Sequence, residues 1–446
     1  MKDAWGYETS GANGTSLPLL EQACHELRCY IGDPVATVDR ALAASPALVM
    51  GHALRAYLHL LGTEPAGLPV ARESLALGSS LPASDREKRH LKAIAELVEG
   101  RWRSAGRILE DLSIDYPLDA LALQAGHATD FFVGDSRMLR DRIARALPAW
   151  SPSLPGYHAL LGMYAFGLEE TGDYVNAEAR GRASVELEPR DGWGQHAVAH
   201  VMEMQRRRRD GIAWMRADPE TWSHESFFAV HNWWHLALFH LDLDEIDETL
   251  ALYDGPIYGK RSGIVLEMID ASAMLWRLHL RGVNPGNRWD ALADTWKPIA
   301  GAGNYAFNDM HAAMAFVGAG RDSAARTVIE AQRAAMQSES DNASFTREVG
   351  HPATRAILAF GEADYAQTVE LLRPIRNHAH RFGGSHAQRD LIDLTLIEAA
   401  RRSGQHGVAR ALEAERQAAR AEAPVAPLRA IVAKHQPAAA RSASVR

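Results

Sequence analysis

Residues 157–189 read YHALLGMYAFGLEETGDYVNAEARGRASVELEP, and this stretch decides the fold class. Apolar residues recur in it at spacings of three and four, which is the pattern of an amphipathic helix, and Gly172 interrupts the pattern midway. Pro189 closes the stretch, because proline lacks the N–H group that a continuing helix needs. The stretch therefore predicts two short helices that are joined by a tight turn at Gly172.

The same pattern occurs earlier in the chain, in residues 85–117. Five positions match at identical offsets: a small residue in the first helix, a turn glycine, an aromatic residue that starts the second helix, a second small residue and the closing proline. They are Ala93, Gly100, Trp102, Ala105 and Pro117 in the first copy and Ala165, Gly172, Tyr174, Ala177 and Pro189 in the second. The unit resembles the tetratricopeptide repeat. Since the two copies are about two units apart, we expect a less regular helix pair around residues 118–147.

Helix pairs of this kind bury their apolar faces only against neighbouring pairs, so they stack into a continuous solenoid. The sequence thus predicts an all-α, tetratricopeptide-like solenoid of antiparallel helix pairs over residues 16–430. An extended N-terminal segment at residues 1–15 precedes it. A tail at 431–446, rich in Ala, Pro and Ser, is expected to be disordered.

Composition narrows the class of protein and its partners. The chain has 446 residues, of which 47% are hydrophobic, with a net charge of -8 that argues against nucleic acid as a partner. Its two cysteines, Cys24 and Cys29, form neither a CxxC pair nor a disulfide framework. The N-terminus, from Met1 to Gly6, shows no apolar h-region, so no signal peptide is expected. No apolar run of about 18 residues occurs, so no membrane span is expected. We predict a cytoplasmic protein and leave a homodimer open.

Histidines are spaced in a helical pattern in two segments. His196, His200 and Glu203 stand at positions i, i+4 and i+7, within about 60° on one helix face. His231 and His235 form a second i,i+4 pair about one helical hairpin later. Two such pairs on neighbouring antiparallel helices would converge on one centre.

These four histidines, His196, His200, His231 and His235, are the predicted ligands of a divalent transition metal, foremost zinc, because imidazole suits zinc, iron, copper and nickel. Glu203 would be a general base or would orient a ligand. The motif is not that of the zincins, because no HExxH occurs. Two other interpretations stay open: the histidines tie helices together by hydrogen bonds, or they line a metal-free ligand pocket.

Residues elsewhere are candidates to complete this site. Asp309 and His311 would join the catalytic centre from a later repeat, Arg389 would hold an anionic group of the substrate, and Asp390 and Trp234 would contact the substrate. The alternative for Asp309, Arg389 and Asp390 is capping and salt bridges between repeats, and for Trp234 it is core packing. A Gly383–Gly384–Ser385 turn precedes Arg389, with Ser385 as the expected N-cap of a helix.

Asp270 lies inside the apolar helical segment Ile269–Trp276. A carboxylate in such a helix needs a polar partner, because burying it unpaired is costly. The sequence does not name that partner.

Several of these segments together resemble the tetratricopeptide repeat protein 38 family. The resemblance spans roughly residues 5–430 and is carried by Met50–Ala53, Gly162–Glu170, His196–Met204, His231–His235, Leu252–Asp254, Phe307–His311 and Gly383–Asp390. It implies a helical repeat fold and supplies no reaction, so the metal site rests on histidine spacing alone.

The histidine spacing favours a metal-dependent hydrolase that acts on a small amide or ester, since a bound divalent ion lowers the pKa of a coordinated water to about 7 and polarises a carbonyl. One alternative is an interaction scaffold that binds a partner peptide in its concave groove. The other is a metal-free protein that binds a small ligand.

Overall fold

The computed structural model describes residues 1–420, and the predicted all-α class is confirmed there. Twenty-four α-helices follow one another, with short 3₁₀ and π turns between some of them. Within residues 1–420 the β-type pairing is limited to two isolated bridges, Lys2–Glu8 and Ile31–Ser226. The tail predicted at 431–446 lies outside the described residues, as do residues 421–430 of the predicted solenoid.

The first twelve helices are α1 (Ser16–Cys29), α2 (Pro34–Ala44), α3 (Val49–Leu60), α4 (Gly67–Ser79), α5 (Asp85–Val98), α6 (Trp102–Asp115), α7 (Ala120–Phe132), α8 (Ser136–Ala146), α9 (Tyr157–Glu169), α10 (Tyr174–Leu187), α11 (Gly192–Met204) and α12 (Arg208–Arg216). The others are α13 (Pro219–Ser223), α14 (Ala229–Asp242), α15 (Ile246–Leu252), α16 (Val265–Leu280), α17 (Arg288–Trp296), α18 (Ala306–Gly318), α19 (Asp322–Ala335), α20 (Asp341–Phe345), α21 (His351–Gly361), α22 (Tyr365–Leu372), α23 (His386–Arg402) and α24 (His406–Ala419).

The two repeated segments form the helix pairs α5/α6 and α9/α10. Gly100 and Gly172 make the turns with φ of +71° and +85°, a region that side chains with a Cβ atom rarely adopt. The four matching alanines, Ala93, Ala105, Ala165 and Ala177, are fully buried where the helices of each pair meet. The irregular pair expected between the two copies is α7/α8.

Helix α23 begins where the sequence predicts a cap. The Ser385 hydroxyl accepts a hydrogen bond from the Gln388 backbone N–H, and the Gln388 side chain accepts from the Ser385 backbone N–H in return. This reciprocal capping box satisfies donors that the first helical turn leaves free. The turn at Gly383–Gly384 thereby places Arg389 and Asp390 near the start of α23.

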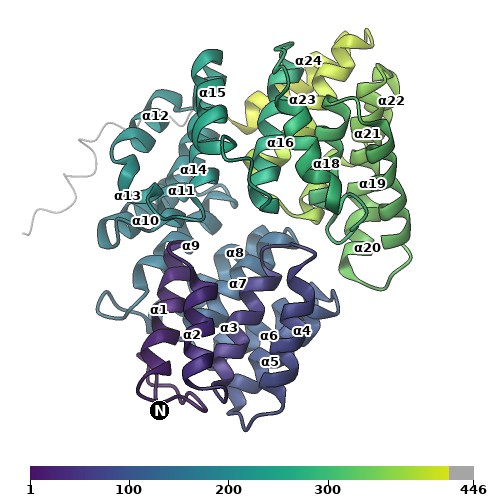
Figure 1. Ribbon diagram of the computed structural model, residues 1–446. Coiled ribbons are helices and arrows are strands. Elements are labelled where there is room, and N and C mark those ends of the chain that lie inside the picture. The colour runs from purple at the N-terminus through teal and green to yellow at the C-terminus, as the bar shows by residue number, and fades with distance from the viewer. Residues whose placement is uncertain (421–446) are drawn as a thin grey trace, which may run out of the picture.

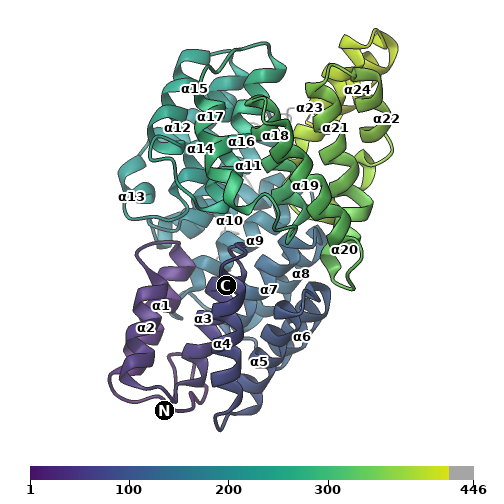
Figure 2. The ribbon, with the colours of Figure 1, turned by 45° about the vertical axis from the view of Figure 1, so that its right-hand side comes forward.

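The helix array curls, so that its late helices contact its early ones. Helices α1–α8 form one end of the molecule, and the later helices form two adjoining groups at the other end, α11–α15 and α16–α24 (Figures 1 and 2). Asp341 at the start of α20 binds Arg103 of α6 at 2.9 Å. The Tyr305 hydroxyl donates to the carbonyl of Phe132 at the end of α7, at 3.0 Å. Residues about 200 positions apart in the sequence are therefore in direct contact.

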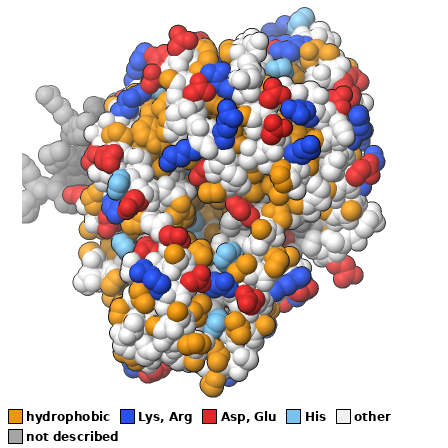
Figure 3. All heavy atoms as spheres, viewed as in Figure 1, with side chains coloured by type: hydrophobic (Ala, Val, Ile, Leu, Met, Phe, Trp, Pro, Cys, Tyr) orange, Lys and Arg blue, Asp and Glu red, His pale blue; other side chains and the backbone are white. Residues whose placement is uncertain are grey.

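The surface shown in Figure 3 mixes acidic, basic and hydrophobic side chains, and it is hollowed between the two ends of the molecule. In the described part of the chain, no helix combines the length and the apolar character that crossing a bilayer requires.

A candidate metal centre between helices α11 and α14

Helix α11 is held in place at its first residues. Asp191 is its N-cap and accepts hydrogen bonds from the backbone N–H groups of Trp193 and Gly194. A Cβ atom on Gly194 would lie 2.7 Å from the Ser184 hydroxyl, so glycine lets α11 pack closely against α10. The fixed start and the close packing set which face of α11 turns towards α14.

The four predicted histidines meet between α11 and α14. His196 and His200 lie on α11, and His231 and His235 lie on α14. Each offers a ring nitrogen, and these four atoms all lie within 4.8 Å of one another. The Nε2 atoms of His196 and His231 are 3.2 Å apart. The cluster is buried, and only His231 keeps a side chain that is partly exposed, at 15%.

A carboxylate lies behind three of the four rings, on the Nδ1 side. Asp270 of α16 lies 2.9 Å from Nδ1 of His231. Glu203 lies 3.3 Å from Nδ1 of His235. Glu169 of α9 lies 3.6 Å from Nδ1 of His200. Asp270 forms a hydrogen bond with His231, and such a carboxylate favours the Nδ1–H form and leaves the Nε2 lone pair for a metal ion. Glu203 and Glu169 lie close to Nδ1 of their histidines without a hydrogen bond.

Several ring nitrogens of the cluster have no hydrogen-bond partner among the described residues. They are Nδ1 of His196 and both ring nitrogens of His200 and of His235. An unpaired buried donor or acceptor costs about 1–3 kcal/mol, so four adjacent imidazoles are a poor way to build a core. A metal ion bound by these nitrogens would remove the cost.

The spacing of the cluster suits a zinc-sized ion. Zinc–nitrogen bonds are about 2.0–2.1 Å long, so two ligands at the tetrahedral angle lie about 3.3 Å apart. The 3.2 Å between the Nε2 atoms of His196 and His231 is close to that value. The four residues therefore fit a transition-metal ion in donor type, and the His196–His231 pair also fits it in spacing.

The electrostatics of the site favour neutral imidazoles. Burial lowers the pKa of His196 and His200 well below the usual value, and the neighbouring imidazoles lower it further. Burial also lowers the pKa of His235, although Glu203 opposes the shift. Neutral rings keep the lone pairs that metal binding requires.

Glu203 and Glu169, two of the three acidic residues beside this centre, differ in the direction of their pKa shifts. Burial acts to raise the pKa of Glu203, but its contacts with His235 and Arg420 outweigh burial, and the pKa is lowered. Burial raises the pKa of Glu169 well above its usual value, and the charges of Glu170 and Glu203 add to the effect. Glu203 thus lies behind a ligand as an anion, a position that favours the orienting role over that of a general base.

Asp309 and His311 lie on α18, and neither belongs to the group of side chains that gathers around the four histidines. Nδ1 of His311 lies 2.8 Å from the carbonyl oxygen of Phe307, and burial lowers the His311 pKa to about 4. Burial raises the pKa of Asp309 to about 7, and Gln332 contacts its carboxyl group. The structure places both as buried polar groups between helices.

Trp234 lies beside the four-histidine cluster and is fully buried. Its ring stacks on the ring of His231, with 5.4 Å between the ring centres and 14° between the planes. The guanidinium of Arg277 lies 5.3 Å from the centre of the same Trp234 ring. In the structure Trp234 therefore packs in the interior between His231 and Arg277.

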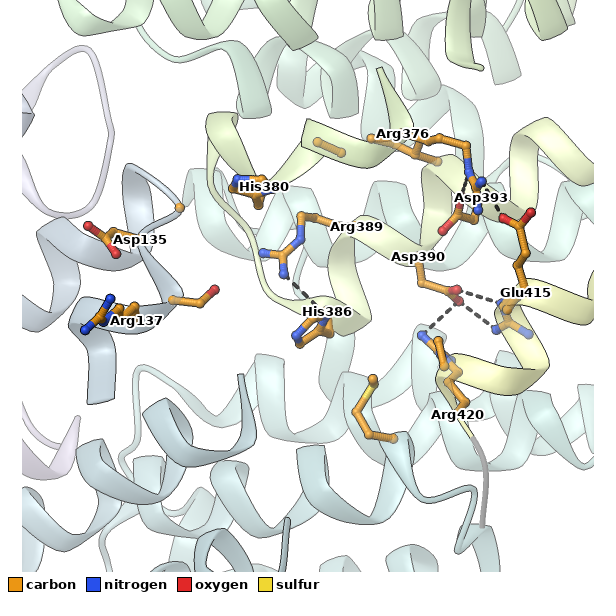
Figure 4. Close-up of a pocket in the computed structure, with 17 residues that line it drawn as sticks. Asp135, Arg137, Arg376, His380, His386, Arg389, Asp390, Asp393, Glu415 and Arg420 are labelled. Atoms are coloured by element: carbon orange, nitrogen blue, oxygen red, sulfur yellow. Dashed lines mark hydrogen bonds and ion pairs between the residues drawn. The ribbon is translucent and has the colours of Figure 1, made fainter. Parts of the chain in front are cut away.

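Arg389 and Asp390 lie together on α23 and line a cavity of about 560 Å³ (Figure 4). Arg389 binds the buried carboxylate of Glu170 at 3.0 Å. Asp390 binds Arg416 at 2.6 Å and Arg420 at 3.2 Å. Burial acts to raise the pKa of Asp390, but the two arginines outweigh it and lower the pKa. Both residues are thus part of an ion-pair network that reaches the cavity.

Sequence reasoning missed Glu169, although a signal was present. Glu169 ends a helix whose inward residues are otherwise apolar, from Ala159 to Leu168. The same signal drew attention to Asp270, for which the structure supplies the partner, His231. An acidic residue at the end of an apolar helix therefore indicates a buried polar partner as well as one in the middle of the helix does.

A search of protein-family models finds none that matches this chain.

Proposed function

We propose that this chain is a metal-dependent hydrolase that acts on a small amide or ester, with zinc as the foremost ion. His196, His200, His231 and His235 would bind the ion. One observation carries the proposal: buried, unpaired imidazole nitrogens gather in one place, with carboxylates behind three of the four rings. The family resemblance to tetratricopeptide repeat protein 38 is part of the same proposal and rests on the sequence segments alone.

The bound ion would lower the pKa of a coordinated water to about 7 and polarise the substrate carbonyl. Hydrolysis needs a coordination position that the protein does not fill, so the site must accept a fifth ligand or release one histidine. A fifth ligand would enter beside His231, since its side chain is the one in the cluster that keeps appreciable exposure, 15%. Asp270 then keeps the His231 ring in position while water or substrate approaches.

The cavity at α23 is where we would expect an anionic group of the substrate to bind. Four arginines line it, and each is paired with a carboxylate: Arg376 with Asp393 and Glu415, Arg389 with Glu170, and Arg416 and Arg420 with Asp390. Glu170 lies between the cavity and the four-histidine cluster. It binds Arg389 of the cavity, and it follows Glu169, whose carboxyl group lies 3.6 Å from His200. A carboxylate or phosphate group of a substrate would bind these arginines by replacing one of their present carboxylate partners.

The rival proposal is an interaction scaffold whose metal ion is purely structural. Four protein ligands saturate a tetrahedral ion, as in closed structural sites. The nearly complete burial of His196, His200 and His235 favours this alternative. A metal-free ligand-binding protein is the third candidate, and the unpaired Nε2 atoms argue against it.

Elemental analysis of the protein, purified without chelators, tests the centre. The double variant His196→Ala/His235→Ala should lose about one equivalent of transition metal relative to the unmodified chain. His240→Ala is the matched control, because His240 lies on the same helix α14 and pairs with Glu245 at 2.6 Å instead of the cluster. Equal metal content in the double variant and the unmodified chain, after reconstitution, would overturn the assignment.

The choice between enzyme and scaffold needs a second measurement. A panel of N-acyl amino acids and small esters should be hydrolysed by the metal-loaded chain, and a chelator should abolish the activity until zinc is returned. If the chain binds metal at this centre but hydrolyses no member of the panel, and the bound ion exchanges no water, the scaffold proposal is favoured.

A further inference from the structure

We propose a second metal site, formed by His25, Cys29 and His158, that takes a zinc-class ion and ties the N-terminal helix to the middle of the chain. The side chains lie outside the four-histidine centre, and the proposal does not depend on it. His25 and Cys29 stand at i and i+4 on α1, so they share one helix face. His158 lies in the first turn of α9.

The three donor groups are close enough to share an ion. A nitrogen of each histidine and the sulfur of Cys29 all lie within 4.8 Å of one another. The sulfur of Cys29 is 3.8 Å from Nδ1 of His25. Zinc–sulfur and zinc–nitrogen bonds of about 2.3 and 2.0 Å put a tetrahedral sulfur–nitrogen pair about 3.5 Å apart. A shift of a few tenths of an ångström would therefore bring this sulfur–nitrogen pair to the distance that a shared ion requires.

The site has its own orienting carboxylate. Asp191 lies 2.7 Å from Nδ1 of His158 and is fully buried. It is fixed in turn by the Ser184 hydroxyl, which donates to it at 2.8 Å. With Asp191 behind Nδ1, the Nε2 lone pair of His158 is left for a metal ion, the same arrangement as in the four-histidine centre.

Packing alone does not explain this cluster. A buried cysteine on its own behaves as a small apolar side chain. Cys29 is fully buried, and neither it nor Cys24 is in a disulfide. Two imidazoles beside the thiol, one of them held by a buried carboxylate, add polar groups that an apolar contact would not require. Burial raises the pKa of the Cys29 thiol, and a coordinated divalent ion would deprotonate it outright.

The donor set selects the kind of ion. A thiolate with two imidazoles suits zinc or another borderline-soft ion and does not suit magnesium or calcium, which prefer oxygen. Three protein ligands leave a fourth position for water, and His25 is partly exposed. The ion would connect α1 to α9. Through Asp191, which also caps α11, it would also brace the helix that carries His196 and His200.

Cobalt substitution of the full-length chain tests the second site, because a thiolate ligand gives Co²⁺ a near-ultraviolet charge-transfer band that an all-imidazole site lacks. The metal-free chain titrated with Co²⁺ should develop this band. Cys29→Ser should lose the band together with about one equivalent of Co²⁺, while the visible bands of the four-histidine centre remain. Cys24→Ser, on the same helix, is the matched control and should keep the band.

His158→Ala is the second variant, and it should also lose the near-ultraviolet band while circular dichroism shows an unchanged helix content. If the unmodified chain binds Co²⁺ without the band, or if Cys29→Ser retains it, the proposal is overturned. The double variant His196→Ala/His235→Ala separates the two sites: the thiolate band should persist there even if the four-histidine centre binds no metal.

Discussion

The carboxylate of Asp270 on α16 lies 2.9 Å from Nδ1 of His231 on α14, and this pair fixes the most exposed ring of the four-histidine cluster. Asp270 is buried and His231 also stacks on Trp234, so the ring has little freedom to rotate. The contact therefore orients the Nε2 atom towards His196, which lies 3.2 Å away.

Asp270→Asn should weaken metal binding without unfolding the chain. The amide keeps the volume but loses the charge that favours the Nδ1–H form of His231, and loss of such a partner lowers metal affinity by about 10- to 100-fold. Competition with a chelator of known affinity measures the change. Asp247→Asn, at an exposed position on α15, is the control and should bind as the unmodified chain does. Equal affinities for the two variants would show that Asp270 does not support the centre.

The metal-free chain should lose stability as the pH falls, in part through His127. Burial lowers the His127 pKa to about 3, so the folded state excludes a proton that the unfolded state takes up at its ordinary pKa of about 6.5. The stability from this group is present above pH 6.5 and falls by up to about 1.4 kcal/mol per pH unit as the pH drops from there towards 3.

Urea unfolding at pH 7, 6 and 5 measures this slope. His127→Gln should flatten it, because glutamine does not titrate. His224→Gln should leave the slope unchanged, since the His224 side chain is 60% exposed. A slope in His127→Gln as steep as that of the unmodified chain would mean that His127 takes up its proton in the folded state.

Arg389→Met should lower the free energy of unfolding by about 3–5 kcal/mol, because it leaves the carboxylate of Glu170 buried without its cation. The side chains are 11% and 1% exposed, so solvent screens the pair little. The double variant Glu170→Gln/Arg389→Met should lose less than the sum of the single variants. Arg381→Met is the control for an exposed pair, with Glu348, and should cost under about 1 kcal/mol. Additive losses would show that the two side chains act independently.

Gly167→Ala should destabilise the contact between α9 and α8. A Cβ atom at this position would lie 2.5 Å from the backbone nitrogen of Arg140, and overpacking of this kind costs about 1–3 kcal/mol. Gly407→Ala on α24 is the matched control, because a Cβ atom there meets nothing within 4 Å. Thermal unfolding of both variants measures the difference, and equal melting temperatures would argue against close packing of α8 on α9.

The sequence could predict the helices and the grouping of the histidines, because both follow from local periodicity. The repeat offsets placed α5/α6 and α9/α10, and i,i+4 spacing put His196 with His200 and His231 with His235 on single helix faces. The two histidine pairs could be expected to meet, because α11 and α14 are near neighbours in the chain and pack together. The second cluster escaped sequence reasoning, since His25 and Cys29 lie more than a hundred residues before His158.

By itself, then, the sequence determined an all-α array and the helix faces on which the paired histidines lie. Only the tertiary structure decided which carboxylates stand behind the rings, that Asp191 orients His158, and that Glu170 meets Arg389 from 219 positions away. The physical reason is that these contacts depend on the curl of the array. The curl is the sum of many small packing angles between successive helices, and each angle is set by side-chain fit and not by any local pattern.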